Sequence, residues 1–197
     1  DSKWISGIKS RNFVHELRNQ NDAVLVGTNT ILKDNPKLTC RLKRKRVSHP
    51  VRIVLDRENK ISLNAKVFSN SKTQRVIYVS GPGLSAKREK LLVGKKIEVI
   101  NGKTGKLGFD LKHLMKLLLQ KNLTSILVEG GSEINSSAFS TGIVDRVYAF
   151  ICPVLIGGRN APGPIGGLGF AKIAKALSLK NMKVVQFGDD LMVEAEP

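Results

Sequence analysis

The sequence is poor in cysteine and contains no long apolar run. Its two cysteines, Cys40 and Cys152, are far apart, and neither has a second cysteine or a histidine beside it. This spacing excludes a disulfide framework and a structural zinc site, so we expect no metal and a reducing, cytoplasmic setting. No apolar stretch approaches the roughly 18 residues that span a bilayer. Residues 1–4 contain neither an initiator methionine nor the start of an apolar signal region, so we expect no membrane association, no export and a natural start further upstream.

Aromatic and acidic residues are also scarce. The chain has one Trp, two Tyr and seven Phe, and its 16 acidic residues stand against 33 basic ones, for a formal net charge of +17. Basic residues bind nucleic-acid phosphates, but here they are dense only over residues 41–46, and single-strand readers need aromatic stacking platforms. The composition therefore does not favour a nucleic-acid-binding protein. It leaves open a solvated excess of surface lysines and a basic cleft that attracts a small polyanion.

Length and composition indicate one folded domain. A chain of 197 residues with 41% hydrophobic and 25% charged residues can bury one full core. No repeat and no low-complexity linker divides it. We therefore expect a single domain over residues 1–197.

Apolar spacing predicts an alternation of strands and helices. The first helix is predicted over residues 7–20, with Ser6 as its N-cap. A second helix is predicted to begin after Asp110, which caps it, and a third is predicted over residues 132–140. Short buried runs predict strands at residues 23–27, 51–56, 75–80, 96–100, 125–129 and 145–152. This alternation is typical of an α/β domain with a mainly parallel sheet.

The last two predicted strands are connected differently. Residues 183–187 and 191–195 are separated only by Gly188, Asp189 and Asp190, which is too short for a parallel crossover. These strands must therefore pair as an antiparallel hairpin. We predict a mostly parallel sheet with an antiparallel C-terminal edge.

Two glycines after a predicted strand give one local signal for a ligand. Glu129 ends the strand, and Gly130 and Gly131 lead into a helix at Ser132. The free N–H groups and the positive dipole end of such a helix can hold a phosphate. A tight strand-to-helix turn explains the two glycines equally well. Glu129 could accordingly face a ligand or only solvent.

Residues 27–41 give a second signal, because they follow another buried strand and reach the same sheet edge, where open α/β sheets bind ligands. They combine hydroxyls, a carboxylate and an arginine, but their chemistry alone also fits a surface loop with a turn at Asn35-Pro36. Neither a G-x-G-x-x-G motif nor a P-loop occurs. The three histidines are scattered, so hydrolytic catalysis has no support, and the H-x-E and C-x-x-C motifs of a zinc deaminase are missing.

Six segments together resemble the reductase domain of the riboflavin-biosynthesis deaminase/reductase. They are S-K-W-I-S-G at residues 2–7, V-H-E-L-R at 14–18, D-A-V-L-V-G at 22–27, T-x-L-x-D-x-P-x-L-T-x-R at 30–41, V-R-I-V-L-D at 51–56 and V-E-G-G at 128–131. Order and spacing agree over nearly the whole chain, including the loop at 153–169 and the final Gly-Asp-Asp-Leu hairpin. The family's fold is dihydrofolate-reductase-like and three-layered, which agrees with the predicted sheet.

The resemblance implies a homodimeric enzyme that uses NADPH to reduce the ribose of 5-amino-6-(5-phosphoribosylamino)uracil to the ribityl compound, with hydride delivered to C1 of a ring-opened, imine-like sugar. It places substrate contacts at Ser2, Arg18, Leu38, Arg41 and Glu129. It places cofactor contacts at Trp4, Thr30, Asp34, Gly131, Ser132, Glu133, Ile134, Asn135, Ser136 and Ser137. Asp34 and Glu129 are the two carboxylates that we expect to be catalytic.

Elementary chemistry agrees with several of these roles. A ribose phosphate suits the arginine forks of Arg18 or Arg41, and a cofactor pyrophosphate suits the helix start after Gly131. Trp4 could cover the nicotinamide or simply anchor the core. Arg57 stands where the family often has a serine that contacts the cofactor. An arginine there could pair with the 2′-phosphate that distinguishes NADPH from NADH.

The sequence departs from the family at its start and leaves two other functions open. The family has an upstream strand with an S-L-D-G-K-like segment, and this sequence begins after it, so we expect the first strand upstream of residue 1 and no deaminase domain within the chain. One alternative is the same reduction on a diaminopyrimidine that has not been deaminated. The other is a phosphate- or nucleic-acid-binding module that has kept the fold without the chemistry.

Overall fold

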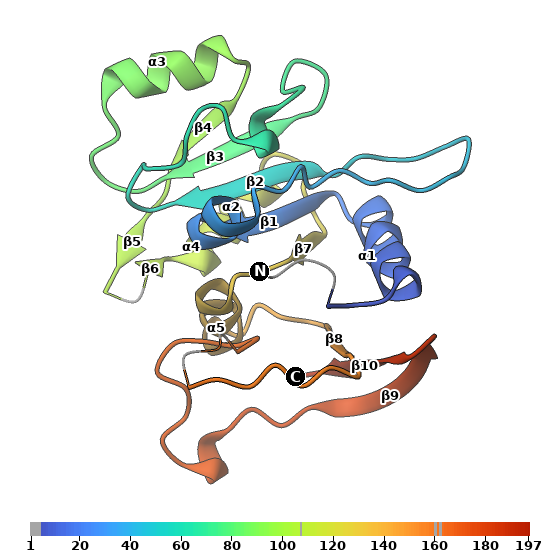
Figure 1. Cartoon of the computed structure of the whole chain (residues 1–197). Helices are drawn as coiled ribbons and strands as arrows, with labels where there is room; N and C mark the ends of the chain where they lie inside the picture. Colours follow the sequence, from blue (N-terminus) through green and yellow to red (C-terminus); the bar gives the residue numbers. More distant parts are fainter. Residues whose placement is uncertain (1–4, 107, 160, 162) are drawn as a thin grey trace.

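The computed structural model describes residues 5–106, 108–159, 161 and 163–197, and it contains two main sheets (Figure 1). The five-stranded parallel sheet consists of β1 (Ala23–Gly27), β2 (Val51–Asp56), β3 (Val76–Ser80), β4 (Glu98–Asn101) and β7 (Ile126–Val128). The three-stranded antiparallel sheet consists of β8 (Val147–Ile151), β9 (Lys180–Phe187) and β10 (Asp190–Glu196). The helices are α1 (Ile8–Gln20), α2 (Thr28–Asp34), α3 (Ala86–Gly94), α4 (Leu111–Leu119) and α5 (Ser132–Thr141).

Helices cover both faces of the parallel sheet, whose strand order is β4-β3-β2-β1-β7. Successive side chains of a strand point to opposite faces. Leu25 and Ile53 therefore join the cluster that includes the apolar face of α4, whereas Val24 and Val54 join the cluster with α2 and α3. Three layers result, and the predicted mainly parallel sheet is confirmed.

The three-stranded sheet has the order β8-β10-β9. The predicted hairpin is confirmed, because β9 and β10 pair antiparallel around Gly188, whose φ of 73° a glycine adopts without strain. One detail differs from the prediction. In the described part of the chain β8 pairs with β10 and not with β7, so the hairpin belongs to a separate sheet and not to the edge of the parallel one.

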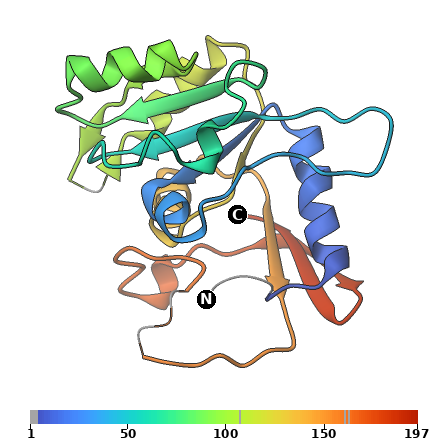
Figure 2. The ribbon, with the colours of Figure 1, turned by 45° about the horizontal axis from the view of Figure 1, so that its top comes forward.

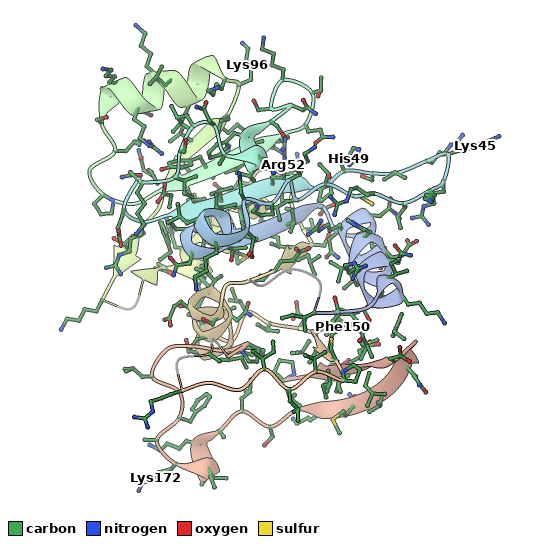
Figure 3. The ribbon with its side chains drawn as sticks, in the orientation of Figure 1. Lys45, His49, Arg52, Lys96, Phe150 and Lys172 are labelled. Carbon is green, nitrogen blue, oxygen red and sulfur yellow. The ribbon has the colours of Figure 1, made fainter. Side chains whose placement is uncertain are left out.

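Helix α1 lies against the three-stranded sheet (Figure 2). The ring of Phe13 lies 5.6 Å from that of Tyr148 and 5.0 Å from that of Phe187, measured between ring centres. Phe150, labelled in Figure 3, belongs to the same aromatic cluster, at 6.3 Å from Phe13. Edge-on aromatic pairs of this kind add to the burial energy. The helix is thereby fixed to strands that follow it by more than a hundred residues.

The predicted cap of α1 at Ser6 is wrong. Gly7 is the N-cap residue and has no side chain to cap the helix. The carboxylate of Asp190 instead accepts hydrogen bonds from the Gly7 N–H at 2.7 Å and from the Ser10 hydroxyl at 2.5 Å. These bonds lower the pKa of Asp190. A side chain from the C-terminal hairpin thus does what a local cap would do.

Some short elements were not predicted: α2, α3 and the two-stranded hairpin of β5 (Thr104–Gly105) and β6 (Gly108–Phe109). The 3₁₀ turns Lys66–Phe68 and Ile173–Lys175 were not predicted either. The predicted cap of α4 is confirmed, because the Asp110 carboxylate accepts from the His113 N–H at 3.0 Å. No helix in the described residues is long and apolar enough to cross a membrane.

A buried arginine fastens the chain after β2. Arg52 is 1% exposed, and its guanidinium donates to the carbonyls of Val67 at 2.6 Å, Ser69 at 2.8 Å and Gln74 at 3.0 Å. Figure 3 shows this side chain beside β2, far from the exposed Lys45 on the loop between α2 and β2. Burial lowers the pKa of Arg52 to about 10, so it stays charged at neutral pH. It holds the segment that carries Lys66 against the sheet.

Candidate functional site: a cationic pocket and an adjoining groove

A pocket rich in positive charge lies where α1, the segment after α2 and the end of β7 meet. Its volume is about 790 Å³, and five basic and two acidic side chains line it. We call it the cationic pocket. Its lining comprises Ile5, Ser6, Arg11, Arg18, Asp34, Asn35, Pro36, Lys37, Leu38, Arg41, Lys66, Glu129, Phe150 and Cys152. Such a charge balance in a concave site concentrates anions.

Arg18 and Glu129 form a two-pronged ion pair in the pocket. The Nε and Nη2 atoms of Arg18 donate to the two carboxylate oxygens of Glu129, each at 2.6 Å, and its Nη1 donates to the Thr39 carbonyl at 3.0 Å. The two side chains are 12% and 18% exposed. A fork-to-carboxylate pair of this geometry fixes the guanidinium plane. Glu129 thus holds Arg18 in a set orientation at the pocket wall.

Arg41, another arginine of the pocket, is hydrogen-bonded to His15 of α1. Its Nε donates to Nε2 of His15 at 3.4 Å, and the Cys40 thiol donates to the His15 carbonyl at 3.1 Å. His15 is 8% exposed. Its burial, and then the positive charges of Arg18 and Arg41, lower its pKa to about 4 against a smaller opposing effect of the Thr39 backbone. The imidazole is therefore neutral at physiological pH.

The segment after α2 turns sharply toward the pocket. Asn35 ends the helix in the left-handed region at φ 42°, at the place where the sequence indicated a turn, and its side-chain oxygen accepts from the Lys66 N–H at 2.8 Å. Leu38 is also left-handed, at φ 54°, and is 3% exposed. Asp34, the last residue of α2, lines the pocket. The turn brings Asp34, Leu38 and Lys66 to one wall.

A larger groove adjoins the pocket between β7, α5 and β8, with a volume of about 2000 Å³. We call it the β7–β8 groove. Glu133, Asn135, Ser136 and Ser137 of α5 line it, and so does Arg57, whose Nη2 donates to the Gly105 carbonyl at 3.1 Å. Hydroxyl, amide and guanidinium donors thus lie along one groove. These are the groups that bind phosphate oxygens.

The loop at 163–169 lies against the first turns of α5. The Gly166 N–H donates to the Ser132 carbonyl at 3.0 Å, and the Gly167 N–H donates to the Glu133 carboxylate at 3.1 Å. The Asn135 amide donates to the Pro164 carbonyl at 2.9 Å. A Cβ at Gly166 would lie 2.5 Å from a Glu133 carboxylate oxygen, so a larger residue there would require the Glu133 side chain to move.

The structure brings the predicted site residues into two adjoining groups. Arg18, Asp34, Leu38, Arg41 and Glu129 line the cationic pocket, and Arg57 and most of the predicted α5 segment line the groove. Thr30 and Gly131 lie side by side, because a Cβ at Gly131 would be 3.4 Å from the Thr30 hydroxyl oxygen. Ile134 packs against the core and Gly27. The predicted contacts Ser2 and Trp4 lie outside the described residues.

Several residues at or beside the pocket were not predicted from the sequence. Arg11 and His15 share a helix face with Arg18 at spacings of seven and three residues. That spacing could have indicated them once Arg18 was chosen. Lys66 reaches the pocket from a 3₁₀ turn beyond β2. No signal in the sequence pointed to it.

Comparisons with known proteins show the family to which this fold belongs. The RibD C-terminal domain family model matches residues 1–193. The riboflavin biosynthesis protein RibD of Actinobacillus pleuropneumoniae is 34% identical over 195 residues, which cover 98% of this chain and 51% of that protein. The 2,5-diamino-6-ribosylamino-4(3H)-pyrimidinone 5′-phosphate reductase of Methanothermobacter thermautotrophicus is 35% identical over 195 residues, which cover 98% of this chain and 88% of that protein.

A solved structure gives the same result. The diaminohydroxyphosphoribosylaminopyrimidine deaminase/5-amino-6-(5-phosphoribosylamino)uracil reductase of Thermotoga maritima has a TM-score of 0.79 and 31% identity, and the match covers 100% of this chain and 51% of that one. The predicted dihydrofolate-reductase-like fold class is thereby confirmed. The chain spans about half the length of the RibD proteins that it matches. On the strength of a family match that takes in almost every residue, the chain belongs to the RibD C-terminal domain family.

Proposed function

We propose that this domain uses NADPH to reduce the ribose of a ribosylaminopyrimidine 5′-phosphate to the ribityl compound, a step of riboflavin biosynthesis. The observation that carries the proposal is the cationic pocket, with its oriented Arg18, beside a groove lined with phosphate-binding groups. The names of the matched relatives support a phosphorylated pyrimidine substrate and an oxidoreductase reaction.

The cationic pocket would hold the substrate through its phosphate. Arg18 and Arg41 supply guanidinium forks, and Lys37 and Lys66 add point charges. Binding energy gained at a phosphate remote from the reacting carbon can orient that carbon. Leu38, buried beside the charged groups, offers an apolar contact to the pyrimidine ring.

The β7–β8 groove fits a nicotinamide dinucleotide by its chemistry. Asn135, Ser136 and Ser137 offer donors to phosphate oxygens, and the first turn of α5 offers the positive end of its dipole. Arg57 would pair with a 2′-phosphate. When bound, NADPH supplies the hydride that reduces the sugar C1. Arg57→Ala should weaken NADPH binding far more than NADH binding, and equal losses for the two cofactors would refute this assignment.

Two carboxylates would serve the reaction in different ways. Both oxygens of Glu129 are bonded to Arg18, so we assign Glu129 mainly to orienting that arginine. Asp34 lines the same pocket at the end of α2, and we assign it to the reacting groups, where it would hold or deliver the proton that accompanies hydride addition. Most of the remaining rate enhancement would come from positioning of the substrate by the pocket.

The substrate can be tested directly with the natural full-length chain. Loss of NADPH absorbance should follow addition of the deaminated pyrimidine or of its diamino precursor, and the ratio of kcat/KM values decides between them. The name of the Thermotoga maritima relative favours the deaminated compound, and that of the archaeal reductase favours the diamino compound. No oxidation of NADPH with either compound, together with tight and salt-sensitive RNA binding, would refute the reductase and favour the binding module.

An extended segment N-terminal to residue 1 is proposed to complete the sheet. Among the described strands β7 has only β1 as a neighbour and β8 has only β10, and the β7–β8 groove lies between these two open edges. Ile126 and Val128 remain only partly buried at its rim. Unpaired edges accept a further strand, and we place it along the apolar part of the groove between β7 and β8, apart from the α5 and Arg57 end that we assign to the cofactor. Such a strand would join both sheets into the single mixed sheet that the sequence predicts.

Hydrogen exchange tests this proposal. Extending the chain upstream should raise Tm and protect the amides of β7 and β8, and unchanged protection of those amides would refute it. The relatives have the length for such a segment, because this chain covers only about half of them. The absence of a deaminase domain within the chain and the cytoplasmic location stay predictions.

The homodimer is proposed to form through β9. This edge strand is exposed along nearly its whole length, with Met182 64% and Val184 59% exposed. An open edge with an apolar face is self-complementary under two-fold symmetry. Light scattering should give twice the monomer mass, and Val184→Lys should halve it. A monomer at high protein concentration would refute the dimer.

A further inference from the structure

We propose that His15 is a positioning residue, whose neutral imidazole orients the Arg41 guanidinium toward the phosphate of the substrate. This inference rests on the proposed function, because it takes the cationic pocket as the phosphate site. His15 itself does not line the pocket, and its side chain reaches the site through Arg41.

Three contacts in succession fix the segment with residues 39–41 against α1. The Thr39 carbonyl accepts from Arg18, the Cys40 thiol donates to the His15 carbonyl, and the Arg41 Nε donates to the His15 Nε2. Cys40 is 2% exposed and His15 8%. The backbone of this segment is thus placed by its neighbours. The direction of the long Arg41 side chain depends on the imidazole alone among these contacts.

Two of the three arginines that line the pocket, Arg18 and Arg41, are each held through Nε by a side-chain acceptor. The Nε atom of Arg18 donates a hydrogen bond to Glu129, and the Nε atom of Arg41 donates one to His15. No acceptor among the described residues takes a hydrogen bond from the terminal nitrogens of Arg41. These nitrogens remain for a ligand, and Arg41 lines the pocket. An arginine held by one edge loses less freedom when it binds an anion.

The group that accepts the hydrogen bond from the Arg41 Nε has to be uncharged, such as a neutral imidazole or a side-chain amide. A carboxylate would neutralise Arg41 as Glu129 does Arg18, and would lower the attraction for a phosphate. A protonated imidazole could not accept a hydrogen bond and would repel both neighbouring guanidiniums. The buried neutral imidazole avoids both effects, and its lowered pKa, caused by burial and by Arg18 and Arg41, keeps it neutral.

A matched pair of amide variants tests the role. His15→Gln places a side-chain acceptor near the position of Nε2, whereas His15→Asn places it one bond short, near Nδ1. Both variants are polar, uncharged and incapable of titration near neutral pH. His113→Asn, at an exposed position of α4, is the control for removal of a histidine. Calorimetry with ribose 5-phosphate measures binding without turnover, and the NADPH assay on the full-length chain measures kcat and KM.

The expected pattern is specific. His15→Asn should raise the Kd for ribose 5-phosphate roughly tenfold, the loss of about one oriented charge-assisted hydrogen bond. It should raise KM for the pyrimidine substrate by a similar factor, and leave kcat and KM for NADPH within about twofold. His15→Gln should stay within about threefold of the unsubstituted protein, and His113→Asn should not differ from it. In an Arg41→Ala background His15→Asn should have no further effect.

Several results would overturn the inference. Equal Kd values for His15→Gln and His15→Asn, or an undiminished effect of His15→Asn in the Arg41→Ala background, would show that His15 acts only through packing. Failure of the unsubstituted protein to bind ribose 5-phosphate would also overturn the inference, because the cationic pocket would then not be a phosphate site. Absence of NADPH oxidation with intact ribose 5-phosphate binding would refute the proposed function alone, because the calorimetric comparison does not depend on turnover.

Discussion

Replacing Glu129 by Gln should change stability and anion binding in opposite directions. Glu129 forms two 2.6 Å bonds with Arg18, and the two side chains are only 18% and 12% exposed. Removing one partner of a buried pair costs about 3–5 kcal/mol, and glutamine keeps one acceptor for Arg18. We therefore expect a loss of about 2 kcal/mol in unfolding free energy, which corresponds to about 4–8 °C in Tm for a chain of this size.

Anion binding should improve because the charge effect is larger than the orientation effect. A unit charge 4 Å away contributes about 1 kcal/mol in water and about 4 kcal/mol near a protein surface. Freeing the Arg18 side chain costs about 0.5–1.5 kcal/mol in lost order. Removing the negative charge should therefore tighten ribose 5-phosphate binding by about 1–2 kcal/mol, or roughly five- to thirtyfold. The gain should shrink as salt concentration rises.

Calorimetry and thermal unfolding of the same samples test this pair of effects. The matched control is Glu16→Gln, because Glu16 lies on α1 and pairs with Arg44 at 2.9 Å while both side chains are well exposed. That exposed pair should contribute less than about 1 kcal/mol. If Glu129→Gln weakened ribose 5-phosphate binding, or left Tm unchanged, the reasoning from charge and burial would be refuted.

Three further predictions concern stability. Arg52→Met leaves three carbonyls without their donor and should cost about 3 kcal/mol in urea unfolding, whereas exposed Arg75→Met should cost less than about 1 kcal/mol; similar losses would contradict the buried role. The lowered pKa of Asp190 stabilises the fold above its ordinary value of 3.8 and ceases to do so as pH falls through the lowered value. Asp190→Asn should therefore lower Tm at pH 7 and have little effect at pH 2, and equal effects would argue against the cap. As pH falls from 6.5 to about 4, His15 is protonated in the unfolded chain before it is in the folded one, so the unfolding free energy should fall by up to about 3 kcal/mol. His15→Gln should remove this fall and the control His113→Gln should keep it. The same fall in His15→Gln would show that it does not come from His15.

The sequence predicts the regular core well because its signals are local. Residues 51–56 are mainly apolar, interrupted by Arg52 and ending in Asp56, and β2 has these bounds. The seven residues of α2 have no such signal, since Thr and Asn are weak helix formers and the turn at Asn35 resembles a loop. The sequence points to Ser6 as the cap of α1 because capping is normally local, but the carboxylate that accepts from the Gly7 N–H belongs to Asp190, which lies 183 residues further along the chain.

The candidate site shows the same limit. Resemblance names Arg18 and Glu129 individually, but their pairing joins residues 111 positions apart and follows only from the fold. Nothing in the sequence indicates a role for His15, because its contact with Arg41 forms only when the segment that carries Arg41 packs against α1. Residue types were thus predictable, whereas their partners depend on tertiary contacts.

The position of α1 has a mechanical consequence. Its N-terminal end is tied to the C-terminal hairpin by Asp190, and its C-terminal end is tied to the strand end at β7 through Arg18 and Glu129. The helix therefore acts as a strut between two sheets that share no strand pairing in the described residues. Any movement of one sheet against the other must tilt this strut and carry Arg11, His15 and Arg18 with it. The shape of the cationic pocket, and with it the affinity for an anion, therefore depends on the relative position of the two sheets.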